Sequence, residues 1–521
     1  MLGDPPPGRA LRGTTQMLVV GRHPPHRRRA GVHRLGRVRV EITSEPLAEV
    51  DADLLAVGLF EGEELAADYR ELPGVADVRP QFKKLTLLRP SGERRLAVVG
   101  LGRREDLDPE RLRVAAAMAV AEARRYDARS VGWALPDDGH GPEALAEAAV
   151  EGTILASFRF DRFRSRDPDD PPPPALERLV IAASRDAEAV GDAAAVARVA
   201  AEAANRAREL QALPANVLTP SYLAERAREI AGGRETVELD VLGPAEIAER
   251  GMGGLAAVAR GSAEEPRLIA LRYSPPAAGV ETLGLVGKAV TFDTGGISIK
   301  PAQRMEEMKM DMSGGAAVLE ALAAIADLGL ALPVVACVPA TENMPGGRAT
   351  KPGDIITQLN GKTVEVNNTD AEGRLILADA LTYCARDLGA DRLVDVATLT
   401  GGVVVALGST YAGLVSNDDS WAERVRSAAE RSGELAWRLP LHEEYKELAR
   451  GKVADLVNSS PKRKATAIYA ASFLEEFVDS KPWVHLDIAG TAWDVGRPYV
   501  GTGPTGWGVR LLVDLARDLA S

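Results

Sequence analysis

The sequence contains few cysteines and no long hydrophobic runs. Its 521 residues include two cysteines, Cys337 and Cys384, and each lies in an apolar stretch. Two thiols in so long a chain provide no disulfide framework, which indicates a reducing compartment. No run of about 18 apolar residues is present, so we expect no membrane span. Together these absences favour a cytoplasmic protein.

An excess of positive charge is also absent. The 75 acidic residues outnumber the 63 basic ones, which gives a net charge of −12. A general nucleic-acid binder needs a basic surface to neutralise phosphates, so this balance argues against nucleic acid as a partner.

Residues 1–37 differ from the rest of the chain. They carry eight arginines amid prolines but lack the continuous apolar core that a signal peptide requires. We interpret them as a disordered extension, or as the result of a start assigned upstream of Met17. A transit peptide is the alternative interpretation.

The remaining sequence predicts an α/β fold with two domains. Strands alternate with helices at 109–126 and 142–157, which predicts a smaller N-terminal α/β domain over 38–185. Residues 186–212 are rich in alanine and predict a connecting helix. A second alternation over 213–521 predicts a C-terminal catalytic α/β/α domain, with a mixed central sheet covered by helices on both faces.

Three segments of the second domain place charged residues beside glycines in apolar surroundings: GKAVTFDTGGISIK (287–300), MKMDMSGG (308–315) and NNTDAEGRL (367–375). Asp293 follows an apolar strand, and the carboxyl ends of strands are where open α/β sheets build their sites. Asp311 comes directly before a predicted helix. Each aspartate alone could instead be a turn residue or a helix cap.

Asp370, Glu372 and Arg374 are spaced two residues apart. In extended backbone such residues project to one face, so two carboxylates and a guanidinium would lie together. Adjacent carboxylates repel unless a cation lies between them, and a divalent metal would supply that charge. The alternative is a solvated edge on which Arg374 is the ion-pair partner.

Lysine usage supports the metal interpretation. Only 12 of the 63 basic residues are lysines, yet Lys288, Lys300 and Lys309 fall within one short stretch. An amine can lose its proton beside a metal and become a ligand, which a guanidinium does not do. Four carboxylates with two lysines at the joints of buried strands therefore favour a metal site over a solvated surface.

These segments resemble the leucine aminopeptidase (cytosol aminopeptidase) family. NTDAEGRL at 368–375 resembles the family's most specific signature, and the spacing from Lys288 to Arg374 is similar throughout. The resemblance is strong over about 210–521. Further similar segments are ATLTGG (397–402), RLPL (438–441), ASFLEEFV (471–478) and HLDIAGTAW (485–493).

The resemblance implies two divalent cations in each subunit. The tighter one would be bound by Lys288, Asp293, Asp311 and Glu372, and the more exchangeable one by Asp293, Asp370 and Glu372. Because this ligand set contains no histidine, oxygen-preferring Mn²⁺ is expected as well as Zn²⁺.

The resemblance also implies the roles of other residues. Lys300 and Arg374 would be the catalytic pair, with a bicarbonate ion at Arg374. The substrate pocket would include Met308, Asn368, Thr398, Leu399 and Gly401.

The function implied is an aminopeptidase that removes leucine-like N-terminal residues from peptides by means of a metal-activated water. A homohexamer, built as a dimer of trimers, is the implied assembly. Two alternatives come from other classes of protein. One is a DNA-binding architectural protein, for which the basic residues 9–37 would be the contact. The other is a two-metal phosphoesterase, because carboxylate pairs serve phosphoryl transfer equally well.

Overall fold

The computed structural model describes residues 37–521 apart from 91–93, 137–140, 166–171, 277–280, 461 and 463. The extension predicted over 1–37 lies outside the described residues, except for its last residue, Arg37, which is exposed. None of the helices in this described part of the chain has the length and apolar character needed to cross a membrane.

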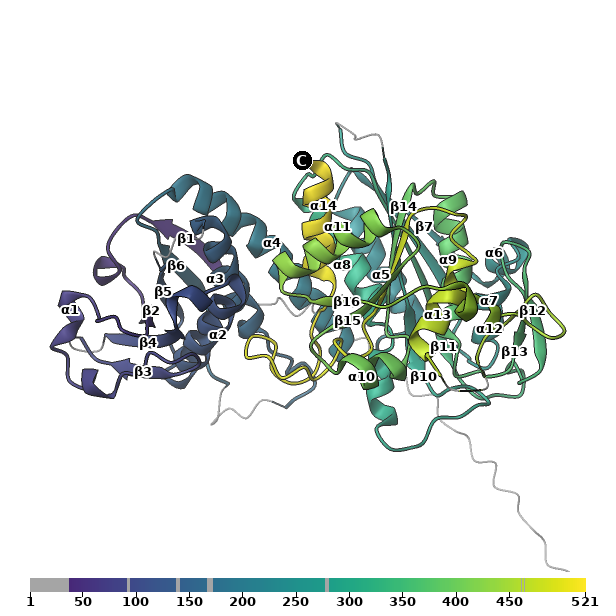
Figure 1. The fold of residues 1–521 in the computed structure, drawn as a ribbon, viewed down its shortest axis with the longest axis horizontal. Coiled ribbons are helices and arrows are strands. Elements are labelled where there is room, and N and C mark those ends of the chain that lie inside the picture. The colour runs from purple at the N-terminus through teal and green to yellow at the C-terminus, as the bar shows by residue number, and fades with distance from the viewer. Residues whose placement is uncertain are drawn as a thin grey trace, which may run out of the picture. The chain divides into compact units, whose positions relative to one another are not determined.

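The first part of the described chain forms a six-stranded sheet in the order β1-β6-β5-β2-β4-β3, flanked by helices (Figure 1). Its strands are parallel except for β3, which runs antiparallel to β4. Asp108 caps the first long helix by accepting the Arg111 N–H, and Pro109 opens that helix. The elements are β1 (Arg39–Thr43), β2 (Leu54–Phe60), α1 (Ala67–Arg70), β3 (Leu85–Leu88), β4 (Arg95–Gly102), α2 (Pro109–Arg125), β5 (Ser130–Ala134), α3 (Pro142–Ser157) and β6 (Arg178–Ala182).

The helix α4 (Ala187–Ala212) follows this sheet and packs against both α3 and α8 (Ser313–Asp327). Most of its buried residues are alanines. Small side chains let neighbouring helices approach closely, so one helix can contact elements of both halves of the chain.

A mixed sheet in the order β16-β15-β18-β14-β9-β11-β8-β7 forms the second half. The central strands β18, β14, β9 and β11 run parallel, whereas β7, β8 and β15 introduce antiparallel pairs. Strands β12, β13 and β17 form a separate three-stranded sheet in that order. The strands are β7 (Val237–Leu242), β8 (Arg267–Tyr273), β9 (Leu283–Gly287), β10 (Ala289–Asp293), β11 (Val334–Asn343), β12 (Asp354–Thr357), β13 (Thr363–Val366), β14 (Arg392–Ala397), β15 (Ala412–Ser416), β16 (Ala436–Arg438), β17 (Leu456–Val457) and β18 (Trp483–Asp487).

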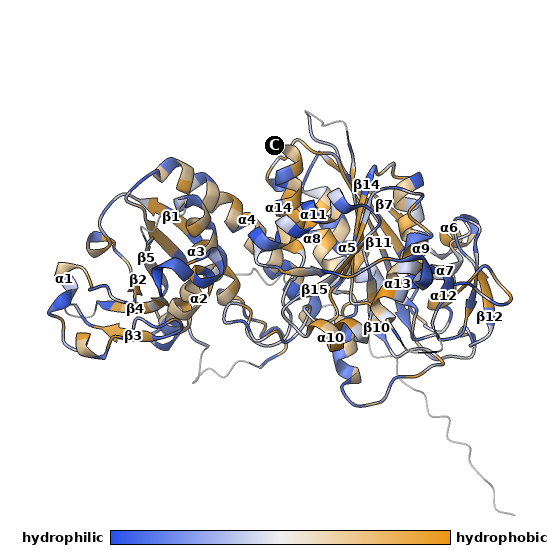
Figure 2. Ribbon diagram, viewed as in Figure 1, coloured by the Kyte–Doolittle hydropathy of each residue, from blue (hydrophilic) through white to orange (hydrophobic). Residues whose placement is uncertain are grey.

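Helices cover both faces of this sheet, which confirms the predicted α/β fold with two domains and mixed sheets. Successive residues of β9 point to opposite faces: Leu285 belongs to the core beneath α8, and Val286 to the core beneath α9. Figure 2 shows the hydrophobic residues gathered on the central strands. The remaining helices are α5 (Pro220–Gly232), α6 (Pro244–Glu249), α7 (Gly253–Ala259), α9 (Gly373–Arg386), α10 (Gly401–Leu407), α11 (Asp419–Ser432), α12 (Glu443–Leu448), α13 (Thr466–Glu475) and α14 (Val509–Ala520).

The apolar run over 282–290 does not form one strand, because it is divided at Lys288. β9 ends at Gly287 between β14 and β11, and β10 then pairs with β11 alone. The division coincides with close packing of α8 on the strand. A Cβ at Gly287 would lie 2.5 Å from the carbonyl oxygen of Gly314, so only glycine fits here.

A buried ion network connects α3 with α2 and α14. Glu151 accepts hydrogen bonds from Arg113 Nε at 2.7 Å and from Arg510 Nη1 at 2.9 Å. All three side chains are less than one tenth exposed. Removing the Glu151 carboxylate would leave the guanidinium groups of Arg113 and Arg510 buried with less negative charge beside them.

We therefore expect Glu151→Ala to lower the free energy of unfolding by about 3 kcal/mol in urea denaturation. Glu447→Ala is the control, because its partner Arg450 and Glu447 itself are both more than half exposed. The control should lose less than about 1 kcal/mol. Similar losses in the two variants would contradict a structural role for the network.

Asp379 anchors α9 from within the core. Its carboxylate accepts N–H groups from Leu255 at 2.9 Å and from Leu359 at 2.8 Å. Burial nevertheless raises the pKa of Asp379 to about 7. The folded protein thus keeps this proton up to about pH 7, whereas the unfolded chain releases it near pH 4. The stability that this group contributes is present below about pH 4 and is lost as the pH rises towards 7.

This pKa predicts a pH-dependent difference between the wild type and Asp379→Asn. The stability advantage of the wild type should be larger at about pH 5 than at about pH 8, as measured by urea unfolding at each pH. Asp192→Asn, which alters an exposed aspartate on α4, should leave the profile unchanged. A difference between Asp379→Asn and the wild type that does not vary with pH would contradict the raised pKa.

Candidate metal and catalytic site

The three acidic segments meet where β10, α8 and α9 come together. Asp293 is the last residue of β10, Asp311 directly follows the 3-10 helix η4 (Met305–Met310), and Glu372 is the N-cap of α9. Asp370 lies in the turn before Glu372. The prediction of extended backbone over 370–374 is wrong, because Glu372 already has helical dihedral angles, φ −73° and ψ −36°. A turn into a helix, and not a strand face, places these side chains together.

Lys288 binds one side of the acidic cluster. Its ammonium nitrogen lies 2.8 Å from Asp311 Oδ2, 2.9 Å from Glu372 Oε1 and 2.9 Å from the carbonyl oxygen of Thr398. The side chain is 3% exposed, so these contacts exclude water from the nitrogen. Lys288 is therefore a buried charge whose three donors are all used within the protein.

Lys300 binds the other side. Its nitrogen lies 2.8 Å from Asp293 Oδ2 and 2.5 Å from Asp370 Oδ1. Its side chain is 22% exposed, in contrast to that of Lys288. One lysine is thus enclosed, and the other can reach a bound molecule.

The electrostatics of the cluster are those of closely packed opposite charges. Burial opposes the charge of both lysines, but the neighbouring carboxylates outweigh it and raise the pKa of Lys288 and of Lys300. Burial raises the pKa of Asp311 to about 8, against the effect of Lys288. Burial and the nearby Asp293 also raise the pKa of Glu372. The two lysines therefore do not balance the negative charge of the four carboxylates.

The oxygen atoms of the cluster fit a metal ion. Oxygens of Asp293, Asp370 and Glu372 all lie within 4.8 Å of one another. Glu372 Oε2 is buried and has no hydrogen-bond partner among the described residues. A buried carboxylate oxygen without a donor is costly unless a cation binds it. The donor set consists of oxygens and amines, which hard divalent cations accept.

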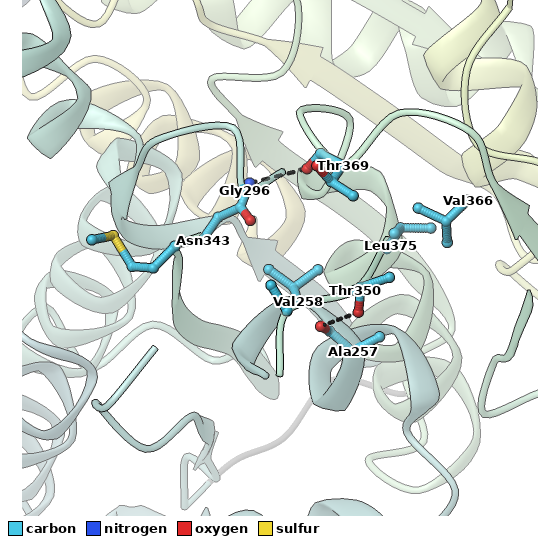
Figure 3. Close-up of a pocket in the computed structure, with 10 residues that line it drawn as sticks. Ala257, Val258, Gly296, Asn343, Thr350, Val366, Thr369 and Leu375 are labelled. Carbon is cyan, nitrogen blue, oxygen red and sulfur yellow. Dashed lines mark hydrogen bonds between the residues drawn. The ribbon is translucent and has the colours of Figure 1, made fainter. Parts of the chain in front are cut away.

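Asn343 positions Asp293. Its amide donates to Asp293 Oδ1 at 2.8 Å and to the Thr369 carbonyl at 3.0 Å, the second contact being visible in Figure 3. Behind these residues lies a cavity of about 10 Å³, large enough for no more than about one water. This cavity cannot admit a substrate side chain. Asn343 follows Thr341 and Glu342 at the end of an apolar strand, and nothing in that sequence pattern indicates this role.

Arg374 is buried at the start of α9. Its Nη1 donates to the carbonyl of Asn458 at 2.8 Å, and its guanidinium lies 5.5 Å from the centre of the Tyr469 ring. Its Nε has no hydrogen-bond partner among the described residues. Asn458 also donates to the Asn368 carbonyl at 2.7 Å and thereby ties the signature segment to Arg374. Asn458, too, was missed from the sequence.

The structure places the predicted pocket residues at different depths. Thr398 is buried within the cluster and donates to Asp311 Oδ1 at 2.8 Å. Asn368 accepts the Asp370 N–H at 3.0 Å. Met308 and Leu399 are half-buried, and Gly401 opens α10 at the surface.

The loop that carries Thr398 is held by a residue that the sequence analysis did not single out. Asp487 accepts the N–H of Leu399 at 3.1 Å and the Thr400 hydroxyl at 2.6 Å. Nearby, His485 is fully buried with Nδ1 2.6 Å from Asp395 Oδ1, as expected of a core histidine. Asp487 lies within HLDIAGTAW, one of the segments that resemble the family, but the resemblance did not indicate that Asp487 holds this loop.

Comparisons with known proteins agree with this architecture. The model of the cytosol aminopeptidase family's catalytic domain matches residues 205–513, and that of its N-terminal domain matches 79–167. The probable cytosol aminopeptidase of Roseiflexus castenholzii is 46% identical over 491 residues, covering 92% of this chain and 99% of that protein. Its counterpart from Solibacter usitatus is 47% identical over 487 residues, with the same coverage.

Solved structures give the same result. The bottromycin maturation enzyme BotP in complex with Mn has 39% identity and a TM-score of 0.81, covering 90% of this chain and all of that one. A mutant of tomato leucine aminopeptidase has 34% identity and a TM-score of 0.83, covering 92% and 96%. Fold and site together define a metal-dependent aminopeptidase. The chain belongs to the cytosol aminopeptidase family, which confirms the resemblance of its sequence.

The contacts of Asn343 predict that a residue outside the acidic cluster affects metal affinity. Asn343→Ala should weaken Mn²⁺ binding by about 10- to 100-fold, because Asp293 would lose the donor that orients it. Calorimetric titration with Mn²⁺ would measure the change. Asn360→Ala, which removes an amide bonded to Glu476 instead, should bind Mn²⁺ like the wild type. Unchanged affinity in Asn343→Ala would contradict the positioning role.

Proposed function

We propose that the protein hydrolyses the N-terminal peptide bond of peptides, preferring leucine-like first residues, with two divalent cations and an activated water. One observation carries the proposal. Four carboxylates and two lysines from three separate segments converge at a largely buried point next to α9. Such a concentration of ionisable groups in one place is typical of an active site.

The proposed ligand sets follow the two sides of the cluster. Lys288, Asp293, Asp311 and Glu372 would hold the tighter cation, and Asp293, Asp370 and Glu372 the more exchangeable one. Glu372 Oε2, which has no hydrogen-bond partner in the described part of the chain, supports this assignment. Mn²⁺ and Zn²⁺ both suit these ligands.

When bound, the cations would supply Lewis acidity and lower the pKa of a water towards neutrality. The protein's own residues then orient the reaction. Lys300 can donate an N–H to the developing oxyanion of the scissile carbonyl. Its partial exposure gives it access to the substrate, which the enclosed Lys288 lacks.

Arg374 would hold a bicarbonate ion, which when bound would supply an acid–base group beside the cations. Its Nη1 is fixed on Asn458, while its Nε is buried and has no hydrogen-bond partner among the described residues. A guanidinium with a free donor suits a small planar oxyanion. Bulky apolar first residues would be accepted by the pocket of Met308, Asn368, Thr398, Leu399 and Gly401.

A homohexamer of two trimers in the cytoplasm remains our prediction for the assembly and its location. Exposed apolar side chains support an oligomer, since Ile299 is 63% and Val405 is 90% exposed. Both cysteines are free and buried, which supports a reducing compartment.

The test is a Mn²⁺ titration of leucyl-anilide hydrolysis by the wild type and by Glu372→Gln. We expect at least about a hundredfold loss of activity in the variant, because a carboxylate shared by both ligand sets becomes a weak neutral ligand. Chelation should abolish wild-type activity, and an N-acetylated substrate should not be cleaved.

Glu306→Gln is the matched control, because Glu306 is exposed on η4. It should retain wild-type activity and folding. Equal activity of Glu372→Gln and the wild type would refute the site assignment. Hydrolysis of nitrophenyl phosphate in place of the anilide would favour the phosphoesterase alternative.

A further inference from the structure

A second cavity is strongly basic, and none of the residues that line it belongs to the carboxylate cluster. It has a volume of about 430 Å³ and is lined by residues of α2, the end of α3, α4, η4 and the segment 493–504. Four of its lining residues are cations: Arg124, Arg159, Arg208 and Lys309. We call this space, with these four residues, the basic cavity. In a chain of net charge −12, such a concentration of positive charge requires an explanation.

No carboxylate among the described residues lines the basic cavity or pairs with its cations. Arg124 donates to the Ala156 carbonyl, and Lys309 donates to that of Ala212 at 2.9 Å. Arg159 likewise donates to backbone carbonyls of the segment 173–174. Other described arginine clusters of this protein pair with carboxylates, as Arg113 and Arg510 do with Glu151 and as Arg424 and Arg431 do with Asp518. The positive charge of the basic cavity is therefore uncompensated within the described chain.

The arginines of the cavity also repel one another. Arg208 is 3% exposed, and burial together with Arg124 and Arg510 lowers its pKa to about 9. Burial and Arg159 lower the pKa of Arg124. Like charges held together in this way destabilise a protein unless an anion binds between them.

Several donors remain free to bind such an anion. A guanidinium has five N–H groups and an ammonium has three. Arg124 and Lys309 each use one in a hydrogen bond within the protein, and Arg159 uses two. Arg208 already uses nearly all of its N–H groups in hydrogen bonds to carbonyls and to Asn205, so it contributes mainly its positive charge.

The walls of the cavity are partly aromatic. Phe158, Phe160 and Trp493 line it, and Arg208 stacks 4.1 Å from the ring centre of Phe158. The volume falls within the range of sites for small organic ligands and exceeds the need of a bare ion. Convergent guanidinium groups match the geometry and double charge of a phosphate better than those of a single carboxylate.

We propose that the basic cavity is a binding site for a small phosphate-bearing molecule, separate from the peptidase site. Arg124, Arg159 and Lys309 would bind the phosphate oxygens, with Arg208 as the buried charge behind them. The aromatic wall would contact the organic part of the ligand.

Calorimetric titration of the Mn²⁺-loaded protein with phenyl phosphate, inorganic phosphate and benzoate tests the proposal. We expect saturable binding of phenyl phosphate, tighter than that of benzoate. The double variant Arg124→Gln/Arg159→Gln should weaken it at least about tenfold, because two charge-assisted contacts are lost. Equal affinity for phenyl phosphate and inorganic phosphate would identify free phosphate as the ligand, whereas tighter binding of phenyl phosphate would identify an organic one.

The double variant Arg125→Gln/Arg129→Gln is the control, because it removes the same charge from exposed positions on α2 and just beyond it. It should bind phenyl phosphate like the wild type. Phenyl phosphate should raise the thermal midpoint of the wild type and of this control, but not that of Arg124→Gln/Arg159→Gln, whose unliganded midpoint should not fall. Undiminished binding in Arg124→Gln/Arg159→Gln would place the ligand on the active-site cations and overturn the proposal, as would absence of saturation or equally tight binding of benzoate.

Discussion

The mutual repulsion of four neighbouring carboxylates is the constraint on which the catalytic half of this protein depends. Asp293, Asp311 and Glu372 are almost fully buried, and Asp370 is half-buried beside them. Such groups remain together only when positive charge lies between them. The backbone around them is accordingly adapted to close approach. A Cβ at Gly295, whose φ is +86°, would lie 2.7 Å from Asp370 Oδ1.

The same constraint accounts for how the elements end. β10 stops at Asp293, and α9 begins directly after Glu372, so that both side chains reach a common point. The free N–H groups and partial positive charge of a helix N-terminus favour a carboxylate at the N-cap position. Because α8 must approach β9 at Gly287 and Gly314, the strand is divided there and Lys288 enters the cluster from the gap.

Much of the fold and the charged residues of the site could be predicted from the sequence. Strand and helix periodicities are local, so the helix over 142–157 was predicted with the bounds that it has. The residues NTDAEGRL stand together in the chain, which made their chemistry visible. Asp370 and Glu372 lie together as the alternation predicted, but a turn and not a strand brings them there, because both geometries can place side chains at i and i+2 side by side.

The supporting residues could not be predicted, for a physical reason. Asn343, Asn458 and Asp487 act through partners 50 to 90 residues away in the chain. A buried polar side chain needs a hydrogen-bond partner, but the amino-acid sequence does not show which group in the fold will be that partner. The division of the apolar run at Lys288 could not be predicted either, because it follows from the packing of α8 and not from the residues of the run.

The choice of lysine at 288 and 300 connects composition with mechanism. In a chain where arginine predominates, Lys288 has its three N–H groups directed to Asp311, Glu372 and the Thr398 carbonyl. A Cβ at Gly373 would lie 2.5 Å from Lys288 Cε, so the space beside the stem is just sufficient for a methylene chain. A planar guanidinium is larger, cannot direct its donors tetrahedrally and does not become a neutral ligand. The shape of the pocket thus selects lysine at position 288, against the bias of the whole sequence towards arginine.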